Sequence, residues 1–164
     1  INDHSDKTLD IRPNTQIVNL SLGALRYMRI RNKVKDQNGS RQCVKFPMEN
    51  GSVFSMGLQT NKEYHHGIHQ DLRPNVIKSS DELAFDGGRI SLTFRNIGTF
   101  VDQHGNISGQ GARTEKIIDP EYCPKKDALQ MLKAFSNENH DNQFDWNENY
   151  GCGFNSIGLN VIDD

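Results

Sequence analysis

The sequence has few cysteines and no long apolar run. Three of its 164 residues are cysteines (Cys43, Cys123 and Cys152), and no two of them form a CxxC pair. Because an odd number of widely spaced cysteines fits neither a disulfide framework nor a zinc ribbon, we expect reduced thiols. No stretch approaches the roughly 18–20 apolar residues of a membrane span, and residues 1–10 are polar and acidic, unlike a signal peptide. We therefore expect an intracellular protein, nuclear or cytoplasmic, with no membrane partner.

The chain also lacks an excess of one charge. It has 19 Lys and Arg against 21 Asp and Glu, a formal net charge of −2. This balance excludes a protein whose whole surface binds a polyanion, which would raise the pI above about 9, but it allows a local basic strip. The length of 164 residues is enough for one globular domain with a sizeable core.

Short segments rich in β-branched and aromatic residues alternate with Gly and Asn turn signals along the chain. This pattern is typical of an all-β sandwich or barrel. The predicted strands are 16–22, 25–31, 42–46, 52–56, 89–95 and 154–161.

One segment, residues 125–135, has the periodicity of an amphipathic helix, which we expect to pack on the outside of the sheets. Its apolar residues at helical spacing are Ala128, Leu129, Met131, Leu132 and Phe135. We interpret Met131 and Phe135 as core contacts rather than as parts of a ligand site.

Residues 137–149 are almost wholly polar and predict a long loop, with Phe144 and Trp146 as the exceptions. These two aromatic side chains either anchor the loop or stack on a partner, and anchoring is the favoured interpretation.

The first candidate for chemistry is the H-x-D at His4 and Asp6. On extended backbone, residues i and i+2 point to the same side, so these two side chains can chelate one ion. Two imidazoles and one carboxylate on one face of a metal leave three positions open, the facial triad of non-haem Fe(II) oxygenases. The third ligand must then come from a distant strand, and a second histidine cluster at His65, His66 and His69 offers candidates.

Arg89 and Arg95 form the second candidate, since they lie six residues apart in a strand-like segment and face the same side. A guanidinium pairs bidentately with a carboxylate, so two of them on one wall suit a dicarboxylate such as 2-oxoglutarate. Taken alone, an H-x-D is usually part of a solvated loop, and an R-x5-R is usually an exposed strand face. A hydrolytic zinc site on the same histidines would leave the arginine pair unexplained.

The order H-x-D, then a histidine 60 residues after Asp6, then R-x5-R resembles the AlkB-type branch of the Fe(II)/2-oxoglutarate dioxygenases. Residues 17–24 (IVNLSLGA) resemble a strand of that family, His66-Gly67-Ile68 resembles its ligand strand, and residues 89–95 resemble its R-x-N-L-T-F-R signature. Residues 109–112 (GQGA) resemble a feature of fungal AlkB-like proteins.

The resemblance implies a double-stranded β-helix, or jelly roll, which agrees with the all-β prediction and its flanking helix. It assigns Fe(II) to His4, Asp6 and His66, because His66 alone occupies the H-G-I position. The implied cosubstrates are 2-oxoglutarate and O2. The residues that the resemblance places around 2-oxoglutarate are Ile17, Asn19, Arg89, Ser91 and Arg95.

The chain departs from the family pattern in three respects. Ser91 stands where many relatives have asparagine, and Thr8 stands where DNA-repair members have an acidic residue that contacts the damaged base. We also expect residues 1–164 to form one catalytic double-stranded β-helix domain that lacks the family's upstream N-x-Y and its nucleotide-recognition lid.

The implied reaction is oxidative demethylation of alkylated single-stranded DNA or RNA, by hydroxylation of an N-alkyl group. In residues 27–33 the side chains of Tyr27, Arg29, Arg31 and Lys33 alternate with Met28 and Ile30. This basic face could bind a phosphate backbone, with Tyr27 stacking on a base, or be an ordinary solvated strand face. Two alternatives remain open: the same chemistry on a protein side chain or small metabolite, and a jelly-roll binding domain without turnover. The residues do not indicate an oligomeric state.

Overall fold

The computed structural model describes residues 2–104, 106–113 and 124–154. These residues belong to two compact units, of which unit 1 comprises Ile1–Asp6 and Asn14–Arg95, and unit 2 comprises Lys7–Pro13 and Asn96–Asp164. None of the helices in these ranges has the length and apolarity that crossing a membrane requires.

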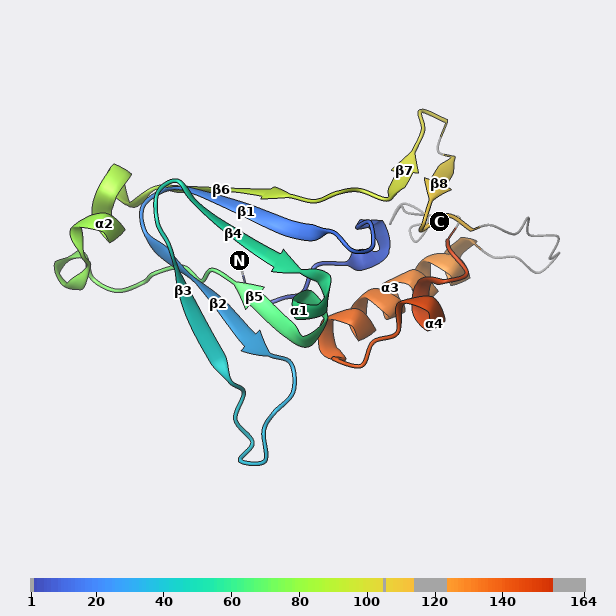
Figure 1. Cartoon of the computed structure of the whole chain (residues 1–164), viewed down its shortest axis with the longest axis horizontal. Helices are drawn as coiled ribbons and strands as arrows, with labels where there is room; N and C mark the ends of the chain where they lie inside the picture. The colour runs from blue at the N-terminus through green and yellow to red at the C-terminus, as the bar shows by residue number, and fades with distance from the viewer. Residues whose placement is uncertain (1, 105, 114–123, 155–164) are drawn as a thin grey trace. The chain divides into compact units, whose positions relative to one another are not determined.

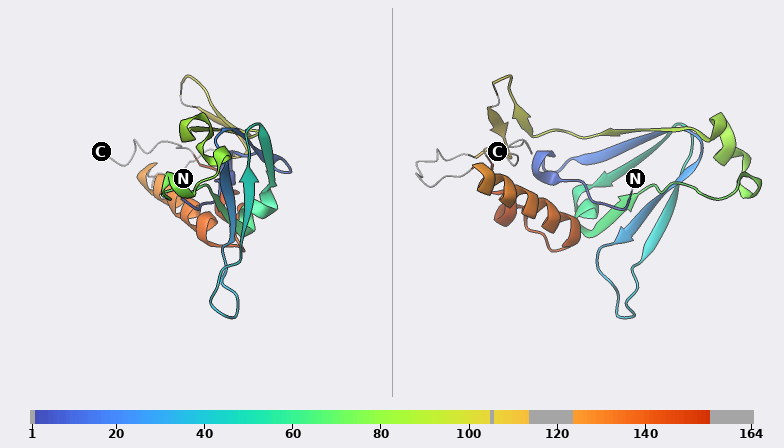
Figure 2. Two further views of the ribbon diagram at one scale, coloured as in Figure 1. Left: turned by 90° about the vertical axis from the view of Figure 1, so that its left-hand side faces the viewer. Right: turned by 180° about the vertical axis from the view of Figure 1, so that it is seen from behind.

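Unit 1 consists of two antiparallel three-stranded sheets (Figures 1 and 2). The first, the β1 sheet, has the order β4-β1-β6, and the second, the β2 sheet, has the order β3-β2-β5. The strands of the β1 sheet are β1 (Gln16–Gly23), β4 (Ser52–Gly57) and β6 (Arg89–Phe94). Those of the β2 sheet are β2 (Arg26–Asn32), β3 (Cys43–Met48) and β5 (Tyr64–Gly67). Within unit 1 only β2 and β3 are consecutive strands of one sheet, so every other connection between these six strands carries the chain from one sheet to the other.

Two-residue alternation gives β1 one more buried face. In β1 the side chains of Ile17, Asn19 and Ser21 are buried, while Val18 and Leu20 between them are only half-buried. Antiparallel pairing puts Met56 opposite Ile17 and Thr93 opposite Asn19, so the same face continues into β4 and β6.

A tight turn after β1 passes the chain to the β2 sheet. Gly23 has φ of +96°, and a Cβ there would lie 2.4 Å from the carbonyl oxygen of Gly88. Only glycine fits this combination of left-handed backbone and close approach. Short helical segments complete the unit: α1 (Leu58–Glu63), η2 (Asn75–Ile77), α2 (Ser80–Leu83) and η3 (Ala84–Gly87).

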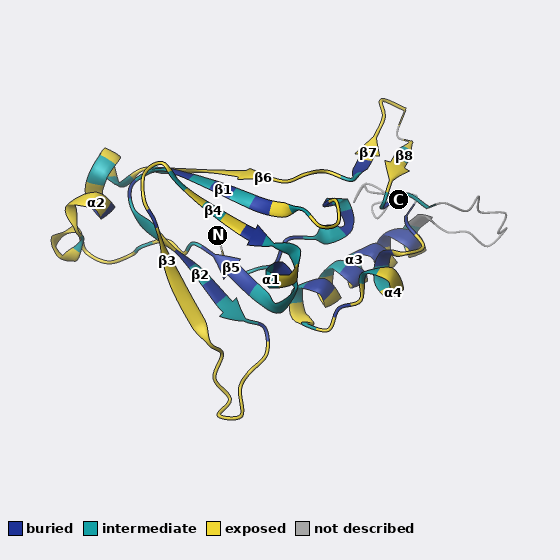
Figure 3. Cartoon of the chain, viewed as in Figure 1, coloured by how far each residue is buried: buried dark blue, intermediate teal, exposed yellow. Residues whose placement is uncertain are grey.

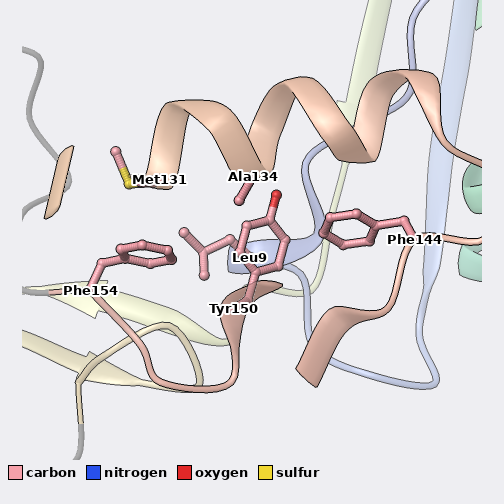
Figure 4. Packing of buried hydrophobic residues seen from close by; sticks show 6 residues of the cluster. All are labelled: Leu9, Met131, Ala134, Phe144, Tyr150 and Phe154. Carbon is pink, nitrogen blue, oxygen red and sulfur yellow. The ribbon is translucent and has the colours of Figure 1, made fainter. Parts of the chain in front are cut away.

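Unit 2 has its own apolar core. It contains the 3-10 segment η1 (Thr8–Asp10), a two-stranded sheet of β7 (Thr99–Val101) and β8 (Ile107–Gly109), and the helices α3 (Pro124–His140) and α4 (Trp146–Tyr150). Figure 4 shows the buried residues of α3 facing side chains from the rest of the unit. This core comprises Leu9, Met131, Ala134, Phe144, Tyr150 and Phe154, with Phe135 and Trp146 packed against it.

The core of unit 2 encloses a carboxylate. Glu138 is 3% exposed and accepts hydrogen bonds from the Thr8 backbone and hydroxyl and from the Tyr150 hydroxyl, the last at 2.7 Å. Close by, the Gln110 amide donates to the carbonyl oxygens of Leu9 and Ile11 at 2.8 and 2.7 Å. Polar side chains therefore fix the backbone that follows Asp6.

Strand-rich antiparallel architecture is confirmed, and five of the six predicted strands lie within two residues of the observed bounds. The sixth, 154–161, lies outside the described residues except for Phe154, and so does Cys123. Cys43 and Cys152 are exposed free thiols, as expected. The sequence patterns missed β5 as an independent element, the β7–β8 hairpin and the short helices.

The predicted loop at 137–149 is wrong in part, because α3 continues to His140 and α4 begins at Trp146. Residues 141–145 between the two helices are irregular, as predicted, whereas the other polar residues lie on helices, and Glu138 among them is buried. Leu129 was expected on the apolar face but is 58% exposed, since the buried face of α3 follows Ala128, Met131 and Ala134 instead. Anchoring of the segment is confirmed, since Phe144 is buried and Trp146 packs on the core.

We expect Tyr150→Phe to lower the free energy of unfolding by about 1–3 kcal/mol, because it removes a donor from a buried carboxylate while keeping the ring. Tyr27→Phe removes the same atom from a side chain that is 43% exposed and should change stability by less than about 0.5 kcal/mol. Chemical denaturation of the two variants measures the difference, and equal midpoints would contradict the role given to the Tyr150 hydroxyl.

Candidate metal and cosubstrate site

The site begins with a pairing of two backbone segments in unit 1. His4 and His66 form an antiparallel bridge, in which the amide of His4 donates to the His66 carbonyl at 3.0 Å and the amide of His66 donates to the His4 carbonyl at 2.7 Å. Because paired residues project to one face, the two imidazole rings lie with their centroids 4.5 Å apart. Residues 62 positions apart in sequence thus become neighbours.

Asp6 joins the two histidines. Its Oδ1 lies 3.6 Å from Nε2 of His4 and 3.8 Å from Nε2 of His66, and the three potential ligand atoms lie within 4.8 Å of one another. The side chain of Asp6 is 7% exposed and that of His66 11%, whereas His4 is 38% exposed. The three groups could hold one metal ion, which would be reached from the side of His4.

Asp6 itself is fixed from two sides. The amide side chain of Asn61, on α1 and fully buried, accepts from the Asp6 amide at 2.8 Å and donates to the Asp6 carbonyl at 2.9 Å. Arg95 Nε donates to Asp6 Oδ2 at 2.7 Å. One carboxylate oxygen is therefore held by Arg95, while the other faces the histidines.

The protonation states of these groups are those that ligate metals. Burial opposes the ionisation of Asp6, but hydrogen bonds from His4 and Arg95 outweigh it and hold the pKa of the carboxyl well below its usual range. Burial lowers the pKa of His66 to about 4, and the attraction of the Asp6 charge only partly opposes this shift. At neutral pH the site therefore offers an anionic carboxylate and a neutral imidazole.

A cavity of about 230 Å3 adjoins these groups and lies between the inner faces of the two sheets. His4 and His66 line it at one end, and alternate residues of β6 with the residue after it, Arg89, Ser91, Thr93 and Arg95, line one wall. Its apolar lining consists of Ile17, Met28, Phe54, Met56 and Ile68.

The polar wall contains groups with unused hydrogen-bonding capacity. Nη2 of Arg89 is buried without a partner, while its Nε donates to Ser21 Oγ at 3.0 Å. Burial, and then the charge of Arg26, lower the pKa of the Arg89 guanidinium. Asn19 donates to Ser91 Oγ at 2.7 Å and to Thr93 Oγ1 at 3.0 Å, and its Oδ1 is a buried acceptor without a partner. A small anion with additional polar atoms would form hydrogen bonds with the unpartnered groups of this wall.

The structure brings eight of the sequence-predicted residues together: Asp6 beside the cavity, and His4, His66, Ile17, Asn19, Arg89, Ser91 and Arg95 in its lining. The four residues expected to contact substrate are not in the lining. Tyr27, Arg29 and Arg31 project from the face of β2 opposite to Met28, and Thr8 is bonded to Glu138. Lys33 was expected to share their face but is 3% exposed, because β2 ends at Asn32 and the alternation ends with it.

Asp3 neutralises part of that basic strand. Its carboxylate lies 3.0 Å from Arg31 Nε and 3.8 Å from Arg29 Nη2, and it pairs with His69 Nε2 at 2.7 Å. Gly67 permits this approach, since a Cβ there would lie 3.0–3.1 Å from atoms of Asp3. The residue before His4 is thus clamped to the outer side of the β2 sheet.

The sequence patterns did not assign Asn61, Asp3 or six of the lining residues to the site. These six are Met28, Phe54, Met56, Gly67, Ile68 and Thr93. Thr93 follows Ser91 by two residues, so strand alternation alone would have found it. Asn61 gave no signal, because its contact with Asp6 spans 55 residues and depends on the position of α1.

Comparison with known families gives one match. The family described as the 2OG-Fe(II) oxygenase superfamily matches residues 1–95, which include every residue of the site described above. No curated protein and no solved structure is significantly similar to the chain.

The low pKa of His66 predicts a pH effect on the metal-free protein. Between pH 6.5 and about 4 the unfolded chain binds a proton at His66 and the folded chain does not, so stability falls as pH falls through this window. His66→Gln should reduce that fall by about 1–3 kcal/mol. Denaturation curves in a chelator at pH 4–7 measure it.

His104→Gln, which removes an exposed imidazole between β7 and β8, serves as the control and should keep the wild-type profile. Identical pH profiles for His66→Gln and the wild type would show that His66 is not held neutral by burial.

Proposed function

The chain belongs to the 2OG-Fe(II) oxygenase superfamily, oxidoreductases that use Fe(II), 2-oxoglutarate and O2, and on this premise we propose that His4, Asp6 and His66 hold its iron and Arg89 its 2-oxoglutarate. The observation that carries the proposal is the convergence of the three ligand atoms beside a cavity in which a guanidinium nitrogen of Arg89 is buried and unpartnered.

The three side chains fit Fe(II) in type and in state. Two imidazole nitrogens and one carboxylate oxygen form a facial set that leaves positions open for a chelating cosubstrate and O2. Arg95 orients Asp6 by holding Oδ2, so that Oδ1 is directed towards the histidines. We therefore assign Arg95 a positioning role at the chelating end of 2-oxoglutarate.

The polar residues of the cavity suit the groups of 2-oxoglutarate. Arg89 offers Nη2 to the remote carboxylate, and Ser21 fixes the guanidinium through Nε. Asn19 and Ser91 supply neutral polar contacts, and Ile17 lies beside them as an apolar wall. Bound iron and 2-oxoglutarate together activate O2 for oxidation of a substrate C–H bond, and the protein residues orient the cosubstrate and exclude water.

We also infer that the two sheets are the two walls of the double-stranded β-helix typical of this superfamily. Connections that cross from one sheet to the other at every step except β2 to β3, with a cavity between the inner faces, support this assignment.

For the substrate we propose an N-alkylated nucleic acid base, DNA or RNA, which places the enzyme in the nucleus or cytoplasm. Hydroxylation of an N-methyl group gives a hemiaminal that loses formaldehyde, so the net reaction is demethylation. The apolar and aromatic part of the cavity, Met28, Met56 and Phe54, supports a planar group. The second candidate, a protein side chain or small metabolite, is favoured by Thr8, which lacks the acidic side chain that would read a damaged base.

Turnover with Fe(II), 2-oxoglutarate and methylated single-stranded oligonucleotides tests the function directly. Succinate should form in step with loss of methyl groups. If methylated peptides stimulate succinate formation and no oligonucleotide does, the substrate is the second candidate, a protein side chain or small metabolite.

His4→Ala and Asp6→Ala should each abolish stoichiometric iron binding, because two remaining ligands in a solvent-accessible site bind weakly. Metal content after anaerobic loading, measured by mass spectrometry, gives the result. His104→Ala, outside the site, should retain iron, and full iron content in either site variant would refute the assignment.

Arg89→Met should raise the KM for 2-oxoglutarate by roughly 30-fold or more, since loss of a buried charge partner costs about 2–5 kcal/mol. Succinate formation against 2-oxoglutarate concentration measures the change. Arg12→Met, at an exposed position that is not part of the cavity lining, is the matched control. An unchanged KM in Arg89→Met would show that the carboxylate binds elsewhere.

A further inference from the structure

The hairpin formed by β2 and β3 concentrates positive charge in a chain that is acidic elsewhere. Residues 29–45 contain six basic residues and one acidic residue, although the whole chain has a net charge of −2. Figures 1 and 2 show that the turn between β2 and β3 extends well beyond the β2 sheet. Its charge is therefore presented to solvent rather than distributed over the fold.

The charged side chains share one surface. Arg29 lies directly opposite Lys45, and Tyr27 opposite Pro47, on the face of the β2 sheet that points away from the cavity. In the turn, Lys35 and Arg41 line one shallow hollow. We call this surface the basic face, and it consists of Tyr27, Arg29, Arg31, Lys35, Arg41 and Lys45.

Most of this charge is uncompensated. Lys35, Arg41 and Lys45 are exposed, and within the described part of the chain none of the three forms an ion pair. Asp3 balances one charge of the Arg29 and Arg31 pair, which stay 26% and 32% exposed. The single acid of the turn, Asp36, accepts from the amides of Asn38 and Ser40 and so stabilises the turn itself. Like charges paired across strands, as Arg29 and Lys45 are, destabilise a sheet unless an anion bridges them.

The basic face adjoins the cavity across one strand. β3 is an edge strand, and its neighbouring residues Lys45 and Phe46 project to opposite faces. The Phe46 ring, 40% exposed, lies 5.7 Å from that of Phe54, which lines the cavity. A chain bound along the outer face can therefore pass over the β3 edge and present a planar group to these two rings. In Figure 3 most of β3 and of the turn before it is coloured as exposed.

We propose that the basic face binds the phosphate backbone of single-stranded nucleic acid and directs one base over β3 towards Phe46 and Phe54. The inference deepens the nucleic-acid substrate proposed above and rests on it. A groove of cations with an exposed aromatic ring is the recognised surface for single strands, where phosphates pair with cations and bases stack. Tyr27, 43% exposed beside Arg29, supplies that ring.

Binding of unmethylated 20-nucleotide DNA and RNA, measured by fluorescence anisotropy between 50 and 200 mM salt, tests the proposal. About three or four phosphate contacts predict a slope of about −2 to −3 for log K against log salt. Lys35→Glu with Lys45→Glu should weaken binding at least about tenfold and make the slope shallower by about 1.4.

The matched control is Lys126→Glu with Lys133→Glu, two exposed positions on α3 that give the same change in net charge. It should keep the affinity within about threefold and leave the slope unchanged. Equal losses in the two double variants, or no loss in either, would overturn the proposal. Competition by poly-glutamate as strong as by the oligonucleotide would overturn it in favour of an acidic polypeptide.

Turnover separates this proposal from the proposed function. Succinate formation without oligonucleotide should be equal in the wild type and in the Lys35→Glu, Lys45→Glu variant, and only the stimulation by methylated oligonucleotide should fall. If all proteins bind iron but form no succinate, the dioxygenase assignment fails, and the binding curves still decide the role of the basic face.

Discussion

Two backbone hydrogen bonds between His4 and His66 are the constraint on which the site depends. They join the segment that carries His4 and Asp6 to the edge of the β2 sheet. Without them, His4 and Asp6 would not be held beside His66. Gly67 allows the approach, Arg31 holds Asp3, which precedes His4, and Asn61 fixes Asp6. Each of these contacts involves or adjoins a proposed metal ligand. The backbone therefore sets the positions of the three ligand side chains, which need little further rotation to converge.

The inner and outer faces of the strands have different roles. The inner faces of β1, β2 and β6 supply the cavity, with Arg89 and Asn19 on one wall and Met28 on the other. The outer face of β2 supplies Arg29 and the charge of the basic face. Neighbouring residues of one strand thus belong to different surfaces. A shift in register by one residue would exchange the cavity residues with the outer residues and destroy both the cavity and the basic face.

Strand alternation explains how much the sequence could predict. It predicts that His4 and Asp6 face the same side of their segment, and that Arg89 and Arg95 face the same side of theirs. In the structure both pairs lie at the same site. The choice of His66 among three histidines needed the H-G-I resemblance, because spacing alone does not distinguish it from its neighbours. Alternation fails where a strand stops, as at Lys33, which is buried although the pattern exposes it.

Contacts between distant segments were beyond prediction. The pairing of Asp6 with Asn61 depends on where α1 packs, and that of Thr8 with Glu138 spans 130 residues. The polar stretch 137–149 predicts a loop because it has no apolar periodicity, although α3 extends through the buried Glu138 to His140. In each case a tertiary contact, absent from local sequence, decides the outcome.

Anomalous diffraction at the iron edge, from crystals grown with Fe(II) and 2-oxoglutarate without O2, would locate the metal and the cosubstrate. We expect one strong peak bonded to Nε2 of His4, Oδ1 of Asp6 and Nε2 of His66, with a dicarboxylate extending from it to Nη2 of Arg89. A peak coordinated by other residues, or a dicarboxylate that leaves Arg89 unpartnered, would contradict it.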